Sequence, residues 1–336
     1  LKTNKCNFVE IDEKIEKDDD SILWGIQGGS LARNCFDYTK SNLLFDKAEA
    51  KYKESVDKDN IANNALEGTA SVLVNNNVND YEGNTYEKIM LNTYKALNFA
   101  SLNDNQNARV EFNRALDRQR KAKEFFESEI KDKKEELEKK SKEEKSGINT
   151  LNVANNMQTQ DVIFKKYDSL LNDFVNPFTT YISGIYFLLN GDRIKARDLL
   201  KESVSMSPKN KQILSDFKFS DRNKLKKSKE KYAWVIFENG EGMAKDEIRI
   251  DIPLFLVSRK VQYTGIALPK IVERSAAYNY LEVNGKKTET IANMDNVIKT
   301  EFKKKFSGVV TEAVMNTVVK TLAQHQLNKN AGPLAG

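Results

Sequence analysis

The stretch from Tyr81 to Gln119 reads YEGNTYEKIMLNTYKALNFASLNDNQNARVEFNRALDRQ, and it decides the fold. Apolar residues recur in it at three- and four-residue steps on both sides of the polar turn 102–105, a pattern typical of two helices with one buried face each. Small side chains at Ala96, Ala108 and Ala115 would let the helix backbones approach closely. The stretch therefore predicts a helical hairpin of the kind found in repeat proteins.

A second hairpin is predicted from Phe164 to Ser207. Pro177 opens its first helix, residues 190–192 form the turn, and Pro208 ends the partner helix. The intervals between key positions match the first hairpin: Ala96, Phe99, Ala108, Phe112 and Ala115 in one, and Gly184, Phe187, Ala196, Leu200 and Ser203 in the other. These intervals resemble the tetratricopeptide pattern of about 34 residues, although the copies lie 88 residues apart (196 − 108). A weaker third copy is expected at Phe36, Ala48, Tyr52 and Ser55.

The remaining segments set the expected domain limits. Four strand-like runs (YAWVIFENG, EIRIDIPLFL, VQYTGIALPKI and AAYNYLEVNG) predict a small antiparallel sheet, and an amphipathic helix from Met294 to Gln326 should cover one of its faces. The fold class is thus α+β and mostly α, with irregular tetratricopeptide-like hairpins before the sheet. The expected segments are a flexible arm (1–20), a helical domain (21–210) with a charged helical insertion (121–160), a basic linker (211–230), a β-sheet and helix domain (231–326) and a disordered tail (327–336).

Three glycines interrupt the first predicted helix, SILWGIQGGSLARNCF. Gly25, Gly28 and Gly29 each cost a helix about 1 kcal/mol relative to alanine. A backbone packed tightly against them would explain their presence. A phosphate-binding loop is the alternative, but the Lys-Ser/Thr pair that should follow is absent.

Composition excludes several function classes. The 336 residues include 54 Lys+Arg and 49 Asp+Glu, interspersed along the chain, so nucleic-acid binding is not expected. The single histidine, His325, and the two cysteines make a zinc site or a Ser-His-Asp triad improbable, and no cofactor is expected. No apolar run is long enough to span a membrane. The chain starts at a residue other than Met, which suggests a mature or trimmed form.

Cys6 and Cys35 leave two possibilities open. They could form a disulfide that pins the N-terminal arm to the first helix, and this would imply an oxidising compartment. They could equally remain two unpaired thiols.

Short motifs over residues 20–325 resemble a known family. They are Leu23-Trp24, Gln27-Gly28, Ser41-Asn42-Leu43-Leu44-Phe45, Tyr81-Glu82-Gly83, Tyr86-Glu87-Lys88-Ile89-Met90, Ala108-Arg109-Val110-Glu111, Phe237-Glu238-Asn239-Gly240, Lys245-Asp246-Glu247-Ile248-Arg249 and Ala267-Leu268-Pro269-Lys270. Together they are similar to bacterial envelope proteins that carry degenerate tetratricopeptide repeats and a small β-rich domain. Members are typically lipoproteins, often encoded beside lipoprotein activators of penicillin-binding proteins. Related small lipoproteins build structures around the flagellar motor.

The resemblance implies a periplasmic protein attached to the outer membrane, with no enzymatic activity. Thr-Asn-Lys precedes Cys6 where a lipobox needs small residues, so any lipid anchor would lie upstream of residue 1. The leading hypothesis is a scaffold or adaptor that binds protein partners, such as other envelope lipoproteins, in a concave groove. The expected partner-binding residues are Tyr81, Glu82, Tyr86, Glu87, Tyr94 and Arg109. The alternative is that they only pack neighbouring helices.

Two other functions are weighed against the scaffold. A cell-wall glycan-acting enzyme would need paired carboxylates in a cleft, for which Glu82, Glu87 and Glu111 are candidates. An anionic-surface binder would use the basic run of Lys224, Lys226, Lys227, Lys229 and Lys231. The identity of the partner, the pathway and the oligomeric state are left open by the sequence.

Overall fold

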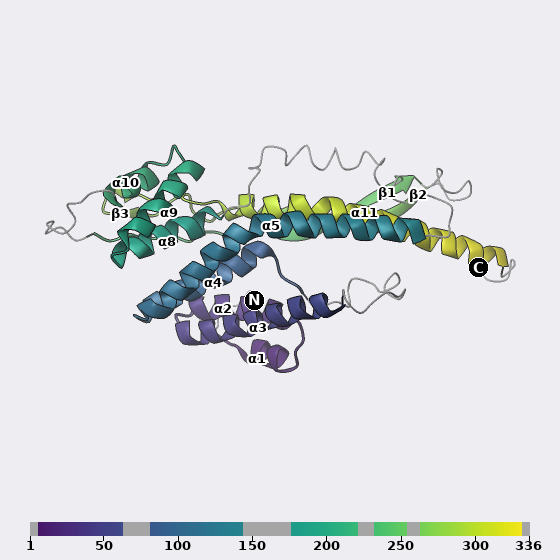
Figure 1. Cartoon of the computed structure of the whole chain (residues 1–336), viewed down its shortest axis with the longest axis horizontal. Coiled ribbons are helices and arrows are strands. Elements are labelled where there is room, and N and C mark those ends of the chain that lie inside the picture. Colours follow the sequence, from purple (N-terminus) through teal and green to yellow (C-terminus); the bar gives the residue numbers. More distant parts are fainter. Residues whose placement is uncertain (1–5, 63–80, 144–175, 221–231, 254–262, 331–336) are drawn as a thin grey trace. The chain divides into compact units, whose positions relative to one another are not determined.

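The computed structural model describes residues 6–62, 81–143, 176–220, 232–253 and 263–330 (Figure 1). The chain forms two compact units. Unit 1 comprises Leu1–Lys121, Val175–Trp234 and Glu289–Ala292, and unit 2 comprises Ala122–Phe174, Val235–Thr288 and Asn293–Gly336. The chain is mostly helical with a small antiparallel sheet, which confirms the α+β class.

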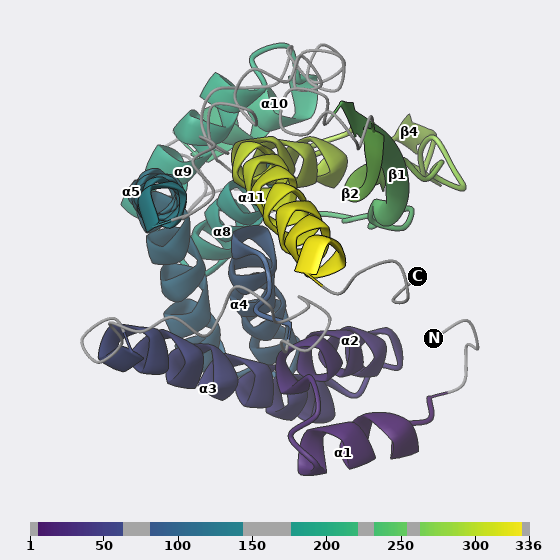
Figure 2. The same ribbon diagram turned by 90° about the vertical axis from the view of Figure 1, so that its right-hand side faces the viewer.

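Unit 1 is built from helices. They are α1 (Val9–Glu16), α2 (Ser21–Asn34), α3 (Tyr38–Ala62), α4 (Thr85–Ser101), the first part of α5 (Asn105–Glu143), α8 (Pro177–Leu189), α9 (Arg193–Met206) and α10 (Lys211–Ser220). Three pairs run antiparallel as hairpins: α2–α3, α4–α5 and α8–α9 (Figure 2). Both hairpins expected from the sequence are therefore present, the second from Pro177 onward, and α5 continues without a break from its hairpin into the charged stretch as far as Glu143. Residues 144–175, which hold the rest of the expected insertion and the expected start of the second hairpin, lie outside the described part of the chain.

The three hairpins share one type of connection. Three residues join each pair, and the middle one is left-handed: φ is 61° at Phe36, 61° at Asn103 and 82° at Gly191. An aspartate follows in each case, and its N–H donates to the carbonyl five residues earlier, which closes the first helix. Its carboxylate then caps the second helix, with the Oδ1 of Asp37, Asp104 or Asp192 accepting a backbone N–H at 2.9, 3.0 or 3.4 Å.

Aligning the connections places equivalent residues in the interior of each hairpin. The buried triplets are Gly29, Ala96 and Gly184, then Ser41, Ala108 and Ala196, then Phe45, Phe112 and Leu200, and then Ala48, Ala115 and Ser203. The expected third copy is therefore seven residues out of register, since Ala48 matches Ala115 rather than Ala108 (115 − 108 = 7). Phe36 lies in the connection and is 78% exposed, so it occupies no interior position. An aromatic residue rarely adopts a left-handed backbone conformation, so the sequence did not indicate that Phe36 lies in the turn. The third copy was therefore placed in the wrong register.

A backbone packs closely against Gly25 of α2, as expected, whereas side chains pack closely against Gly28 and Gly29. A Cβ on Gly25 would lie 2.9 Å from the Leu44 carbonyl oxygen, and one on Gly29 would lie 2.5 Å from the Phe45 ring. Gly28 is equally crowded by Ile11 of α1. All three glycines lie inside the continuous helix α2, so the phosphate-loop alternative is wrong.

The N-terminal arm differs from the expectation of a flexible segment. Residues 9–16 form helix α1, and Ile11 is 1% exposed in the space that Gly28 leaves open. Cys6 and Cys35 are joined by a disulfide, with 6.0 Å between their Cα atoms. The sequence did not predict this helix, because the segment is polar and a single deeply buried residue gives no clear helical periodicity.

The expected basic linker is also partly wrong. Its first half is helix α10, in which Ile213 is buried against α8 and α9. The Asp216 carboxylate, 4% exposed, accepts hydrogen bonds from the Tyr181 hydroxyl (2.6 Å) and the Trp234 indole N–H (3.1 Å). Residues 221–230 lie outside the described part of the chain.

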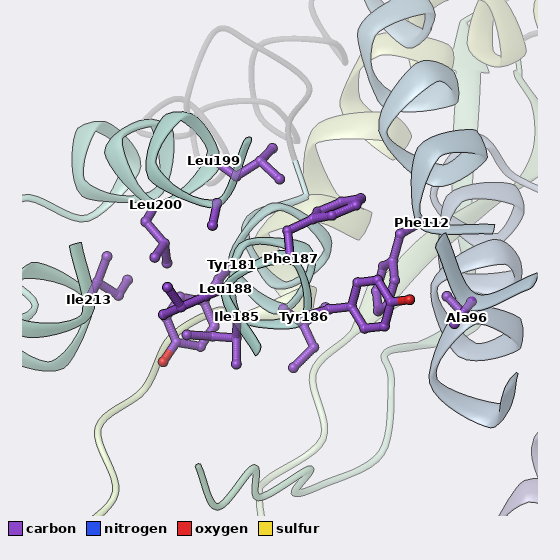
Figure 3. Packing of buried hydrophobic residues seen from close by; sticks show 13 residues of the cluster. Ala96, Phe112, Tyr181, Ile185, Tyr186, Phe187, Leu188, Leu199, Leu200 and Ile213 are labelled. Carbon is purple, nitrogen blue, oxygen red and sulfur yellow. The ribbon is translucent and has the colours of Figure 1, made fainter. Parts of the chain in front are cut away.

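The largest core of unit 1 joins the second and third hairpins. Phe112 of α5 stacks on Tyr186 of α8 with ring centroids 4.6 Å apart (Figure 3). Phe187 and Leu200, both with no exposed surface, fill the interior of the third hairpin, and Ile213 brings α10 onto it. The array therefore ends in a helix that covers its last apolar face.

Unit 2 contains a two-stranded ribbon beside a long helix. Strand β1 (Ala244–Pro253) pairs antiparallel with β2 (Tyr263–Val272), opposing Ile248 to Leu268. Helix α11 (Met294–Asn330) packs against β2 (Figure 2), where Ile266 and Leu268 are buried with Val297 and Phe306. The expected helix cover is thus confirmed. Residues 327–330 belong to α11 rather than to a disordered tail.

Of the four expected strands, one is absent from the described residues and one is reduced to two residues. The run at 232–240 has no strand, and the run at 276–285 contains only Glu282–Val283 (β3), paired with Lys286–Lys287 (β4). Asn284 and Gly285, with φ of 50° and 75°, make the turn expected of that dipeptide. Aromatic and β-branched residues suggested strands here, but strand propensity needs a neighbouring strand to become a sheet. Within the described residues, no helix is long and apolar enough to cross a membrane.

Candidate functional site

A buried ionic cluster joins the first hairpin to the second. The Lys95 ammonium on α4 lies 2.7 Å from Asp46 and 2.9 Å from Glu49 on α3, and 3.2 Å from Glu111 on α5. Lys95, Glu49 and Glu111 are almost fully buried. The positive and negative charges of the cluster are balanced, because Arg118 contacts Glu49 and Arg114 contacts Glu111, each at 2.6 Å.

Opposite charges in this cluster favour the charged forms of Glu49 and Lys95. Burial by itself would raise the pKa of Glu49, but the Lys95 ammonium and the Arg118 guanidinium outweigh it and lower that pKa from 4.5 to about 2. Burial would lower the pKa of Lys95, and its carboxylate partners raise it instead. The cluster therefore fixes the positions of α3, α4 and α5 relative to one another.

Neutral hydrogen bonds make the next junction. The Gln119 amide of α5 donates to the Thr180 hydroxyl of α8 at 2.7 Å, and its carbonyl oxygen accepts the Asn176 N–H at 3.1 Å. The hydroxyls of Thr93 and Thr179 are 2.8 Å apart between α4 and α8. The first helix of the third hairpin thus contacts both helices of the second. Helix α4 repeats this arrangement one step earlier, through Lys95 to α3 and through Asn98, whose side-chain oxygen lies 2.7 Å from Arg33 of α2.

Three of the predicted partner-binding residues come together at the start of α4. The Glu87 carboxylate accepts the Tyr81 hydroxyl at 2.7 Å and the Asn84 N–H at 2.6 Å, and the Tyr86 hydroxyl lies 3.3 Å away. Burial, with Glu87 adding to it, raises the pKa of Tyr81 far above its ordinary value, which keeps the phenol protonated. Asn84 and Glu87 form the capping box that begins the helix, and the two tyrosine hydroxyls surround the Glu87 carboxylate.

The other three predicted residues lie apart from this group. Glu82 is exposed next to Tyr81. Tyr94 is half-buried on α4 beneath the Arg33 guanidinium, which lies 5.1 Å from its ring centre. Arg109 bridges to Asp192 of the third hairpin at 2.5 Å and covers the Phe187 ring. The six residues therefore do not line one groove, and five of them make contacts within the chain.

Six exposed apolar side chains of unit 1 lie in or near the three hairpin connections. We call this set the tip patch: Phe36, Leu43, Leu102, Val110, Leu189 and Ile194, with exposed fractions of 40% to 81%. The three connections lie at the same end of the stacked hairpins (Figure 1). Leu43 and Val110 occupy equivalent positions, six residues after Asp37 and Asp104. Amphipathic periodicity did not identify them, because it marks buried faces and does not single out exposed apolar residues.

Two of the three candidates for catalysis, Glu87 and Glu111, are engaged in structural contacts, and Glu82 is exposed apart from them. Glu87 and Glu111 belong to separate internal networks, the first at the α4 cap and the second beside Lys95. The basic run from Lys224 to Lys231 lies outside the described residues, as does the side chain of His325. Within the described part of the chain, no group of three His, Cys, Asp or Glu side chains is arranged to hold a metal ion. Searches among protein families, curated proteins and solved structures return no match to this chain.

Proposed function

We propose that this chain is a non-enzymatic scaffold that binds protein partners through a tetratricopeptide-like helical array. The observation that carries the proposal is the repeated connection of α2–α3, α4–α5 and α8–α9, with its left-handed residue and aspartate cap. A second regularity supports it, since α4 and α8 each contact both helices of the preceding hairpin. Stacked hairpins of this kind expose extended surfaces that suit protein binding.

The partner contacts the tip patch in this proposal. Its exposed apolar side chains come from all three hairpins, and exposed apolar patches on a folded surface mark interaction sites. Of the residues expected from the sequence, Glu82 and Arg109 keep enough exposed surface to add polar contacts. Tyr81, Tyr86, Glu87 and Tyr94 act indirectly, by fixing α4.

A cell-envelope location completes the proposal. Disulfides persist in oxidising compartments such as the bacterial periplasm, which agrees with the Cys6–Cys35 bond. The family resemblance supports the same compartment, with attachment to the outer membrane through an anchor upstream of residue 1. The proposed partners are other envelope lipoproteins, in complexes for peptidoglycan synthesis or around the flagellar motor.

Site-specific photocrosslinking in the native bacterium tests the proposal. A photoreactive residue replaces Phe36 or Ile194 in the tip patch, and Lys209, exposed at the opposite end of α9, is the matched control. We expect one discrete adduct from each of the two tip positions and none from Lys209. The purified partner should then bind the chain, and Phe36→Asn should weaken that binding. Adducts of equal yield from all three positions, or none from any, would contradict the tip patch. Release of muropeptides from sacculi by the purified chain would contradict a non-enzymatic role.

A further inference from the structure

Helix α10 depends on contacts from distant parts of the chain, because it is too short to be stable by itself. It has 10 residues, and isolated helices shorter than about 12–15 residues are marginal in water. Ile213 packs it on the third hairpin, directed toward Leu200 of α9 (Figure 3). Residues 232–234 and 289–292 also belong to unit 1, and they pack on the same core through Trp234 and Ile291.

Residues 289–292, which we call the strap, cap the beginning of α10. The Glu289 carboxylate accepts the first two N–H groups of the helix at 3.0 and 3.2 Å, and the side-chain oxygen of Asn210 accepts the third at 2.9 Å. The Asn210 amide also donates to the Thr290 carbonyl at 2.9 Å. The first N–H groups of a helix have no partner within it, so α10 takes two of its acceptors from the strap.

The second half of α10 is held by Trp234. Its indole N–H donates to the Asp216 carboxylate at 3.1 Å, and its ring lies beside Phe219 with centroids 5.9 Å apart. Asp216 is buried, and its other donors are the Tyr181 hydroxyl at 2.6 Å and the Gln212 amide at 3.1 Å. Because a buried carboxylate needs donors, loss of the indole N–H would weaken the attachment of α10.

The strap lies between two residues that are fixed in unit 2. Before it, the Thr288 N–H donates to the Leu281 carbonyl at 2.9 Å, and the Thr288 hydroxyl accepts the Leu281 N–H at 3.0 Å. After it, the Asn293 side-chain oxygen accepts the Asp295 N–H at 2.9 Å at the start of α11. No spare residue separates the strap from these hydrogen-bonded residues on either side.

We propose that α10 is a conformational switch, which the strap keeps folded onto the helical array only while unit 2 is folded. Loosening the start of α11 withdraws Glu289 and Ile291 from α10, because the strap has no slack. The short helix then opens and exposes the apolar face that Ile213 covers. The state of unit 2 therefore controls the end of the array. This control does not depend on the proposed scaffold function.

Amide hydrogen exchange of the full chain tests the proposal, with exchange at residues 211–220 compared with that of α2. Glu289→Ala should speed exchange in α10 about 3- to 10-fold, because the helix loses its cap. Trp234→Phe keeps a ring and removes the N–H, and it should speed exchange about 10-fold. Glu247→Ala is the matched control, because Glu247 is an exposed glutamate on β1, and it should leave α10 unchanged.

A cavity in unit 2 tests the coupling itself. Leu268 is buried on β2, and Leu268→Ala should speed exchange in α10 but not in α2. Ile266→Val on the same strand is the milder variant if Leu268→Ala does not fold. Inserting six Gly and Ser residues after Ala292 gives the strap slack and should remove most of the response of α10.

Three results would overturn the proposal. The first is exchange in α10 that neither Glu289→Ala nor Trp234→Phe changes, since the strap and Trp234 would then not hold the helix. The second is exchange in α10 that stays the same when β2 is destabilised, or that rises equally in α2. The third is a response to Leu268→Ala that the insertion leaves intact, because the strap would then not transmit it.

Discussion

Replacing Lys95 by methionine should destabilise unit 1 strongly, because it removes a buried cation and leaves its carboxylate partners. Glu49 and Glu111 stay buried, and each keeps one arginine at 2.6 Å. Breaking a buried pair in this way costs about 3–5 kcal/mol, and because the arginines remain we expect a loss of about 3 kcal/mol at pH 7. The melting temperature should fall by roughly 5–10 °C.

The pH dependence makes this prediction sharper. The pKa of Glu49 is lowered from 4.5 to about 2 by folding, so its contribution of about 3 kcal/mol is complete above pH 4.5 and is lost as the pH falls toward 2. Without Lys95 the pKa of Glu49 should rise, and the variant gains less stability above pH 4.5. The difference between wild type and Lys95→Met should therefore shrink as the solution is acidified.

Urea denaturation followed by circular dichroism from pH 7 to pH 3 measures this difference. Lys14→Met is the matched control, because Lys14 forms an exposed ion pair with Asp19 and its loss should change stability little. A Lys95→Met loss no larger than the Lys14→Met loss would refute the reasoning. A loss that stays constant with pH would refute the assignment to Glu49.

Three further predictions use the same denaturation assay. Gly29→Ala should lower the free energy of unfolding by about 1–3 kcal/mol, because the new Cβ would lie 2.5 Å from the Phe45 ring. Gly184→Ala should lower it less, since the nearest atom to its Cβ would be 3.0 Å away, and equal losses would contradict the packing argument. Reduction of the Cys6–Cys35 disulfide, which closes a separation of 29 residues, should cost about 3–4 kcal/mol and lower the hydrogen-exchange protection of α1; unchanged protection would show that packing alone holds the helix. Phe36→Asn should stabilise the chain by about 1 kcal/mol, because asparagine tolerates the left-handed position better, as Asn103 does in the second hairpin; a loss of stability would show that the contact of Phe36 with Tyr38 outweighs the strain.

The hairpins could be predicted because their signal is local. Helix periodicity, the turn residues and the small residues at Ala96 and Ala108 all fall within one stretch of chain, so no distant contact is needed to recognise them. The same holds for the Asn284-Gly285 turn and for the apolar face of α11. The third copy was out of register because Phe36 occupies a position where glycine or asparagine is expected.

The candidate site was harder to predict, because its residues come from different hairpins and meet only in the folded chain. Nothing local distinguishes Lys95, which is buried in the ionic cluster, from the many lysines on helix surfaces. Tyr81 and Glu87 attract attention by their residue types, but their hydroxyl and carboxylate bond to each other.

The sequence by itself determined the α+β class, the helix pairs, the turns and the shortage of histidine and cysteine for metal or triad chemistry. These features depend on neighbours a few residues apart, whose spacing sets which face is buried. Only the tertiary structure decided that the polar arm holds a helix, that the strand-like run at 232–240 forms no strand and that the run at 276–285 forms only the short strand β3. It also decided that the Tyr81–Gln119 hairpin stacks through a buried lysine and leaves the tip patch exposed. Burial and pairing depend on residues brought together from distant parts of the chain, and local periodicity carries no information about which of them meet.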